Sequence, residues 1–130
     1  INGNGRQYLR FIASSASGPG LPDNNNSLTI GRNKTITFDG FESVATLNGA
    51  SSDSTLASDT RTGLLRFVRS GSLVTAYQWN AGSGNWTALN SANLPPGPVI
   101  LSLQGLVAGG TGTIRMEKDT LKVTIGEVLP

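Results

Sequence analysis

Apolar and polar residues alternate over short runs along most of the chain, and the clearest runs lie near its middle. Leu64 to Arg69 and Ser72 to Trp79 both alternate with a period of two, which is typical of β-strands. The polar dipeptide Ser70-Gly71 between them is a connection of the kind that closes a β-hairpin. A turn rich in Asn, Gly and Ser follows at Asn80 to Gly84, and Asn85 to Leu89 resumes strand character. These residues predict three antiparallel strands.

The first half of the chain is expected to hold four further strands and two long loops. The expected strands are Gln7 to Ala13, Leu28 to Ile30, Thr35 to Phe38 and Phe41 to Leu47. Gly31 to Asn33 is expected to separate two of them, and Asp39-Gly40 is a strong hairpin signal between the last two. Ser14 to Asn26 predicts a loop, because its prolines fix φ and lack a backbone donor. Asn48 to Thr62 is polar and predicts a second, exposed loop.

The last third of the chain predicts another three strands. Leu94 to Pro98 is proline-rich and predicts an extended connection. Val99 to Val107 is the most apolar run and predicts a central strand of a sheet. Thr113 to Glu117 and Leu121 to Ile125 predict a final hairpin around Lys118-Asp119. About ten short strands in a chain of this length predict an antiparallel β-sandwich or barrel without substantial helix.

The composition agrees with an all-β fold in a single domain. The chain has 130 residues and a mass of 13.5 kDa, which suffices for one hydrophobic core, so we expect one domain over residues 1–130. It contains 17 Gly residues, and only 14% of its residues are charged, whereas helix-favouring residues are scarce. No apolar run approaches the roughly 20 residues that a membrane-spanning helix requires, so we expect no membrane insertion.

Charge and residue usage narrow the range of sites. Ten Lys and Arg against eight Asp and Glu leave a net charge of +2, and the basic residues do not interleave with aromatic ones, so we expect no nucleic acid partner. The chain has no Cys and no His, which excludes disulfides, thiolate metal sites and His-activated nucleophiles. Its Ser, Thr, Asn and Gly content indicates an extracellular or cell-surface protein, or a virion protein. Because the chain begins at Ile1 rather than Met, we expect a processed chain or a fragment.

Several motifs in the second half belong together. The pattern L-R-x-x-R-x-G-S-x-x-x-A-Y-x-W runs from Leu65 to Trp79, and W-x-x-L follows at Trp86 to Leu89. A proline-led strand over Pro96 to Leu103 and a closing strand over Leu121 to Ile125 complete the set. Through these motifs the segment from Gly63 to Gly126 resembles the concanavalin A-like lectin and glucanase (laminin G-like) superfamily, in particular its small bacterial modules. The resemblance covers about half the chain and implies a jelly-roll sandwich.

The predicted hairpin divides its side chains between two faces. One face holds Leu65, Phe67, Arg69, Ser72, Val74, Ala76 and Gln78, and the other holds Leu64, Arg66, Val68, Leu73, Thr75, Tyr77 and Trp79. The rings of Tyr77 and Trp79 can stack on the C–H face of a pyranose while Arg66 binds its hydroxyls. We therefore expect Arg66, Thr75, Tyr77 and Trp79 to bind a ligand. The alternative is that Tyr77 and Trp79 are core residues between two sheets, with Arg66 at an edge.

Catalytic and metal sites are not expected. A retaining glucanase needs two carboxylates about 5 Å apart on one face, and no predicted strand carries such a pair. Asp39 and Glu42 are expected to straddle a turn and to point to opposite faces. Asp23 with the asparagines after it, and Asp53 with Asp59, have oxygen ligands suited to calcium, but Asx-turns in exposed loops are the favoured interpretation. We expect no enzyme, no cofactor and no bound metal.

Two functions from different classes fit these observations. The first is a non-catalytic extracellular module that recognises a polysaccharide or glycan through the face of Arg66, Tyr77 and Trp79. The alternative is a structural subunit of a surface filament, pilus-like fibre or virion, assembled from copies of itself by strand sharing. In that case Gln7 to Ala13 or Leu121 to Ile125 is expected to pair with the next subunit.

Overall fold

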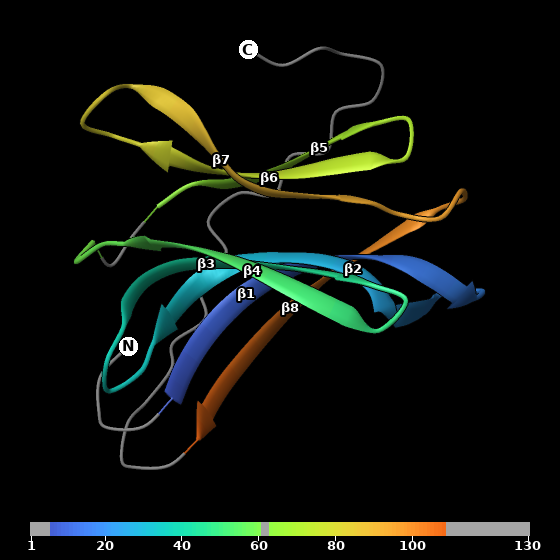
Figure 1. Ribbon diagram of the computed structural model, residues 1–130, viewed down its shortest axis with the longest axis horizontal. Helices are drawn as coiled ribbons and strands as arrows, with labels where there is room; N and C mark the ends of the chain where they lie inside the picture. The colour runs from blue at the N-terminus through green and yellow to red at the C-terminus, as the bar shows by residue number, and fades with distance from the viewer. Residues whose placement is uncertain (1–5, 61–62, 109–130) are drawn as a thin grey trace.

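The computed structural model describes residues 6–60 and 63–108 of the chain, and all regular elements in these ranges are β-strands. The strands are β1 (Arg6–Gly18), β2 (Leu21–Lys34), β3 (Asp39–Leu47), β4 (Ala50–Ala57), β5 (Leu65–Ser70), β6 (Leu73–Asn80), β7 (Asn85–Asn93) and β8 (Val99–Ala108). They form two antiparallel sheets: sheet A has the order β4-β3-β2-β1-β8, and sheet B has the order β5-β6-β7 (Figure 1). The prediction of an all-β antiparallel fold is confirmed, with eight strands in the described residues in place of about ten.

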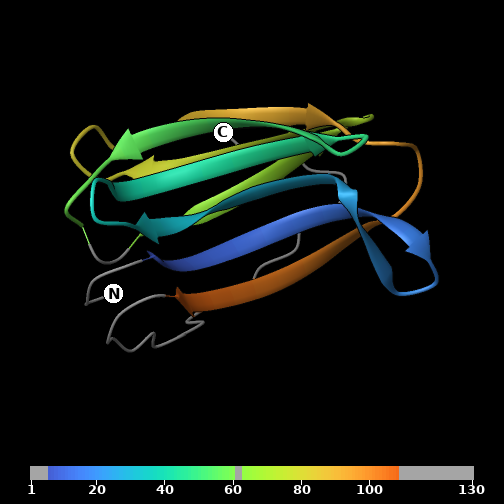
Figure 2. The same cartoon turned by 60° about the horizontal axis from the view of Figure 1, so that its bottom comes forward.

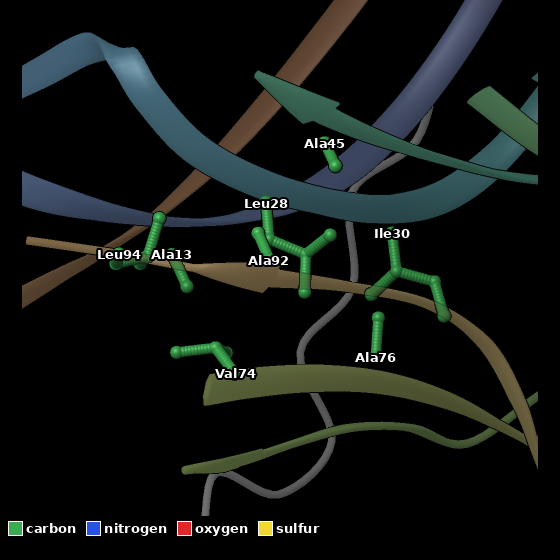
Figure 3. Packing of buried hydrophobic residues seen from close by; sticks show 8 residues of the cluster. All are labelled: Ala13, Leu28, Ile30, Ala45, Val74, Ala76, Ala92 and Leu94. Atoms are coloured by element: carbon green, nitrogen blue, oxygen red, sulfur yellow. The ribbon is translucent and has the colours of Figure 1, made fainter. Parts of the chain in front are cut away.

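One hydrophobic cluster joins the two sheets (Figure 3). Its side chains come from both sheets and from Leu94, the residue that follows β7. Each of them is at most 4% exposed. The members are Ala13, Leu28, Ile30, Ala45, Val74, Ala76, Ala92 and Leu94. Half of these residues are alanines. Because their side chains are small, the strands that contribute them can pack closely.

Sheet B covers only part of sheet A. β7 packs against β3 and β4, β6 packs against β2, and β1 and β8 lie at the other margin of sheet A (Figure 2). Leu101 and Leu103 pair with core-side residues of β1 and therefore face the same side as the core, yet they are 45% and 40% exposed. β8 begins at Val99 as predicted, but it ends the row of described strands instead of lying inside it.

In the β5–β6 hairpin the side chains lie on the predicted faces, but the turn is formed by other residues than predicted. Gly71 and Ser72 form the connection, because Ser70 pairs with Leu73. This turn lies one residue later than expected, which moves every cross-strand partner by two positions. A shift of two leaves each side chain on the face predicted for it, because strand side chains alternate with a period of two.

A long hairpin replaces the loop expected over Ser14 to Asn26. β1 and β2 run through this segment with two irregularities in their register, and Pro19-Gly20 forms the turn, with Gly20 at a φ of 69°. β8 pairs with β1 only up to Ser15, and β3 pairs with β2 only from Ser27. Beyond these pairings no described strand flanks the hairpin tip. Its contacts on the β2 side are with the β3–β4 turn, where the backbone N–H groups of Gly49 and Asn48 donate to the Asn25 carbonyl and the Asn26 side chain, so Pro22 removes no hydrogen bond to a flanking strand.

Thr35 to Phe38, expected as a strand, is the turn between β2 and β3. The Thr35 hydroxyl accepts hydrogen bonds from the backbone N–H groups of Thr37 at 3.3 Å and Phe38 at 3.0 Å. Such side-chain bonds satisfy the backbone locally and compete with strand pairing. Asp39-Gly40, expected as the turn, opens β3, and β2 passes through Gly31 to Asn33 without a break.

β4 lies in the segment expected as the second loop, Asn48 to Thr62. Asn48 and Gly49 join it to β3 with φ values of 50° and 81°, as in a type I′ hairpin turn. β4 ends the row of sheet A strands, and its sequence ASSDSTLA is exposed at every position but one. Ser, Thr and Asp suit a strand with one side open to solvent, because they discourage pairing with other chains. The apolar alternation of a half-buried strand is therefore missing.

The strands expected at Thr113 to Glu117 and Leu121 to Ile125 lie outside the described residues. Up to Ala108, consecutive strands are neighbours within one sheet, and the chain passes from sheet to sheet only between β4 and β5 and between β7 and β8. Nothing in the described part of the chain is a helix long and apolar enough to cross a membrane.

Candidate functional site

The four residues predicted to bind a ligand lie on one face of sheet B. Every second residue of β6 from Val74 to Gln78 is buried, so Thr75, Tyr77 and Trp79 lie on the opposite, outer face. Arg66 pairs with Tyr77 from β5, the strand at one edge of sheet B, and shares this face. All four side chains are partly exposed. The alternative in which Tyr77 and Trp79 are buried between the sheets is therefore wrong.

Trp86 of β7 belongs to the same face, although it was not predicted as a site residue. It lies directly opposite Trp79, and the two ring centroids are 5.4 Å apart in an edge-to-face arrangement. The register of β6 and β7 shifts by one residue between Ala76 and Tyr77. Without this bulge Thr87 would face Trp79, and Trp86 would point toward the core.

The Arg66 guanidinium contacts two of the aromatic rings on this face. The guanidinium carbon lies 4.2 Å from the ring centroid of Trp86 and 5.2 Å from that of Tyr77. Both distances are within the range of cation–π attraction. The aromatic face, defined as Arg66, Tyr77, Trp79 and Trp86, therefore presents three partly exposed rings around one fixed cation, with the Thr75 hydroxyl on the same strand.

The described strands of sheet B, β5, β6 and β7, contain no Asp or Glu. The sequence holds no Asp or Glu between Asp59 and Glu117, so sheet B carries the positive charges of Arg66 and Arg69 alone. These strands therefore lack the carboxylate pair that a glycosidase would need.

The acidic residues of β3 form ion pairs with basic residues of sheet A. Asp39 forms ion pairs with Arg32 at 2.5 Å and with Lys34 at 3.6 Å, whereas Glu42 lies 3.9 Å from Arg6. Burial opposes ionisation of Asp39, but the hydrogen bond and charge of Arg32 and the charge of Lys34 outweigh it and hold its pKa below the ordinary value. Asp39 and Glu42 point to opposite faces as expected, although both lie within β3 and straddle no turn.

Asp23 forms a local turn. Its carboxylate accepts hydrogen bonds from the backbone N–H of Asn25 at 3.0 Å and from the side-chain amide of Asn26 at 3.0 Å. The Asn26 bond is the largest of the effects that lower the pKa of Asp23, and the Asn25 bond adds to it. These contacts are those of an Asx-turn. Among the described residues no three acidic side chains gather in a way that could hold a metal ion.

The chain was compared with protein-family models, curated proteins and solved structures, and no match was found in any of the three comparisons.

Proposed function

We propose that this protein is a non-catalytic recognition module that binds carbohydrate on the aromatic face of sheet B. The observation that carries the proposal is the clustering of Tyr77, Trp79 and Trp86 on the outer side of a sheet whose other side supplies the core. These rings are not part of the hydrophobic cluster between the sheets. Their apolar faces suit the C–H faces of a pyranose, and the neighbouring cation and hydroxyl suit its hydroxyl groups.

A flat strand surface is a suitable support for such a site. The rings come from neighbouring strands, β6 and β7, and Arg66 reaches them from β5. Residues held on paired strands lose little further conformational entropy when a ligand binds. We infer that the two sheets pack as a β-sandwich of the concanavalin A-like kind, in which the aromatic face points away from sheet A, and that the module works outside the cell or at its surface.

A glycan array followed by fluorescence titration tests this proposal. The chain has two Trp residues, and both belong to the aromatic face, so intrinsic Trp emission reports on this site alone. We expect at least one neutral or acidic glycan to change the emission, and Trp79→Ala to weaken its binding about tenfold or more, with Trp86 as the remaining reporter.

Leu73→Ala is a matched control for Trp79→Ala. Leu73 lies on the same strand and face, is 38% exposed and lies at the far end of β6 from Trp79. Its loss is expected to leave affinity within about twofold of the wild type. Absence of binding to every glycan, or unchanged affinity of a folded Trp79→Ala variant, contradicts the proposal.

The exposed leucines of β8 favour a second candidate, a structural subunit of a filament or virion built from copies of this chain. Leu101 and Leu103 face the core side and are partly exposed, and β1 is the only neighbour of β8 among the described strands. Strand sharing with another copy would cover these residues. Gln7 to Ala13 is not available as the donor, because β1 is paired on both sides within its own chain. Leu121 to Ile125, the other donor candidate, lies outside the described residues.

Light scattering after size-exclusion chromatography, combined with electron microscopy, separates the two functions. A subunit is expected to form regular fibres or shells whose mass depends on concentration. A monomer that stays monomeric on concentration to the millimolar range contradicts the subunit function and is the result expected for the recognition module.

A further inference from the structure

A groove crosses the outer face of sheet A, on the opposite side of the molecule from the aromatic face. Its volume is about 560 Å³, within the range of ligand-binding clefts, and residues from all five strands of the sheet line it. The sheet curves along its strands, as Figure 2 shows. The lining of the groove differs from the aromatic face, because hydroxyl, amide and small apolar side chains replace the rings.

One end of the groove holds a fixed cation. Arg10 of β1 donates from Nε and Nη2 to the Oε1 atom of Gln104 on β8, at 3.0 Å and 2.8 Å. Its guanidinium carbon also lies 4.4 Å from the ring centroid of Tyr8. The amide and the ring hold Arg10 without neutralising it, and its Nη1 donors remain for a ligand.

The carboxylates on this face do not neutralise Arg10. Glu42 is paired with Arg6 and accepts a hydrogen bond from the Asn33 side chain at 3.0 Å. Asp53 lies opposite Val44 on the outermost strand, β4, away from Arg10 on β1. Within the described residues Arg10 forms no ion pair. It is therefore a positioned positive charge that can form a charge-assisted hydrogen bond with an anionic ligand.

The rest of the groove is suited to a chain of hydroxyl groups. Ile12 and Val44 supply apolar surface in the lining. At the β3–β4 side, the hydroxyls of Thr46 and Ser51 lie 2.8 Å apart, and each can still bond to a ligand. Hydroxyl groups both donate and accept, as do the hydroxyls of a sugar, whereas a peptide offers its donors and acceptors at fixed separate positions.

We propose that this groove binds an acidic oligosaccharide, with a uronic acid carboxylate on Arg10 and sugar hydroxyls along Thr46 and Ser51. The bond to Arg10 is a charge-assisted hydrogen bond, which is stronger and more directional than a bond between neutral groups. The site does not depend on the aromatic face. The two surfaces would let the module contact two segments of glycan from opposite sides.

Calorimetric titration with a defined oligogalacturonate tests this inference, and the neutral oligomer made from it by carboxyl reduction serves as the reference ligand. We expect the acidic oligomer to bind and the reduced one to bind at least about tenfold more weakly. Arg10→Gln is expected to reduce the affinity for the acidic oligomer by a similar factor. Gln104→Glu, which places a competing carboxylate beside Arg10 while keeping Arg10 itself, is expected to act in the same direction.

Arg69→Gln is the matched control, because it removes the same charge from the β5–β6 hairpin and is expected to leave the affinity unchanged within about twofold. If Trp79→Ala weakens the binding of the acidic oligomer and Arg10→Gln does not, the oligomer binds the aromatic face and the inference is overturned. Circular dichroism confirms folding, and Gln104→Glu carries the test if Arg10→Gln does not fold. The inference is overturned if the acidic oligomer does not bind, if the reduced oligomer or an oligoglutamate of equal charge binds as tightly, or if folded Arg10 and Gln104 variants bind like the wild type.

Discussion

Gly31 of β2 lies directly opposite Arg10 of β1. A Cβ atom at this position would lie 2.2 Å from the carbonyl oxygen of Leu9 and 2.5 Å from the Cα atom of Arg10, and backbone atoms in a paired strand cannot move aside cheaply. We expect Gly31→Ala to lower the free energy of unfolding by about 2–3 kcal/mol, measured by urea denaturation. Gly18→Ala is the control, because its Cβ would make only an ordinary contact of 3.5 Å with Leu21. Equal stability of the two variants would contradict this account.

Asp39 is expected to contribute to the acid sensitivity of folding. Its folded pKa lies below the unfolded value of about 3.9, so its ion pairs stabilise the fold fully above about pH 4 and are lost as the pH falls through the folded pKa. The side chain is 39% exposed, so the contribution is expected to be about 0.2–1 kcal/mol. Asp39→Asn should flatten the fall in unfolding free energy below pH 4, as measured by urea titrations at several pH values. Asp53→Asn, which removes a carboxylate outside these ion pairs, is the control.

The composition of the aromatic face was predictable only in part. Arg66, Tyr77 and Trp79 share a face by alternation on two strands joined by a two-residue turn, and moving this turn by one residue leaves the faces unchanged. Trp86 was out of reach, because its side depends on a bulge of one residue in β7. In the structure the bulge lets the adjacent residues Leu89 and Asn90 both face inward, where Leu89 packs on the core and the Asn90 side chain donates to the Ser43 carbonyl at 3.2 Å, and the sequence does not reveal this.

At the level of elements, prediction succeeded where apolar alternation is strong and failed where turns or edges determine the structure. β5 and β6 were found from their alternation, and β8 was found from its apolar run. β4 was missed because it has almost no apolar residues, although the Asn48-Gly49 dipeptide before it is a strong hairpin signal. The tip of the β1–β2 hairpin was missed because its prolines were taken to exclude a strand. Prolines exclude only a strand that is flanked on both sides, whereas this tip is paired on one side.

The β3–β4 connection is expected to depend on Gly49. Its φ of 81° lies in the left-handed region, where a Cβ costs about 1–2 kcal/mol. Gly49→Ala should therefore destabilise the protein by that amount and speed hydrogen exchange in β4 more than in β2. Asn48→Gly, which keeps the turn accessible, should preserve protection in β4. Uniform loss of protection across sheet A in Gly49→Ala would show that β4 does not open independently.

Across the whole molecule, the core tolerates little added volume. Ala76 is fully buried where β6 meets β2, within a cluster that contains three other alanines. Ala76→Leu should cost about 2–3 kcal/mol of unfolding free energy, because the larger side chain must push the sheets apart or leave its rotamer minimum. Ala88→Leu, at an exposed position of β7, should change stability by less than about 0.5 kcal/mol in the same denaturation experiment. A stable Ala76→Leu variant would show unfilled space in the core.

The pairing of β1 with β8 also has a consequence for biosynthesis. Arg6 pairs with Ala108 and Ser15 with Val99, so the first and last described strands are neighbours. On the ribosome, β2 is available to β1 almost at once, whereas the second edge of β1 stays open until β8 has left the exit tunnel. Pairings so distant along the chain close slowly. Sheet A therefore forms fully only after synthesis has passed Ala108, and during translation the open edge of β1 is a target for chaperones and for premature association between nascent chains.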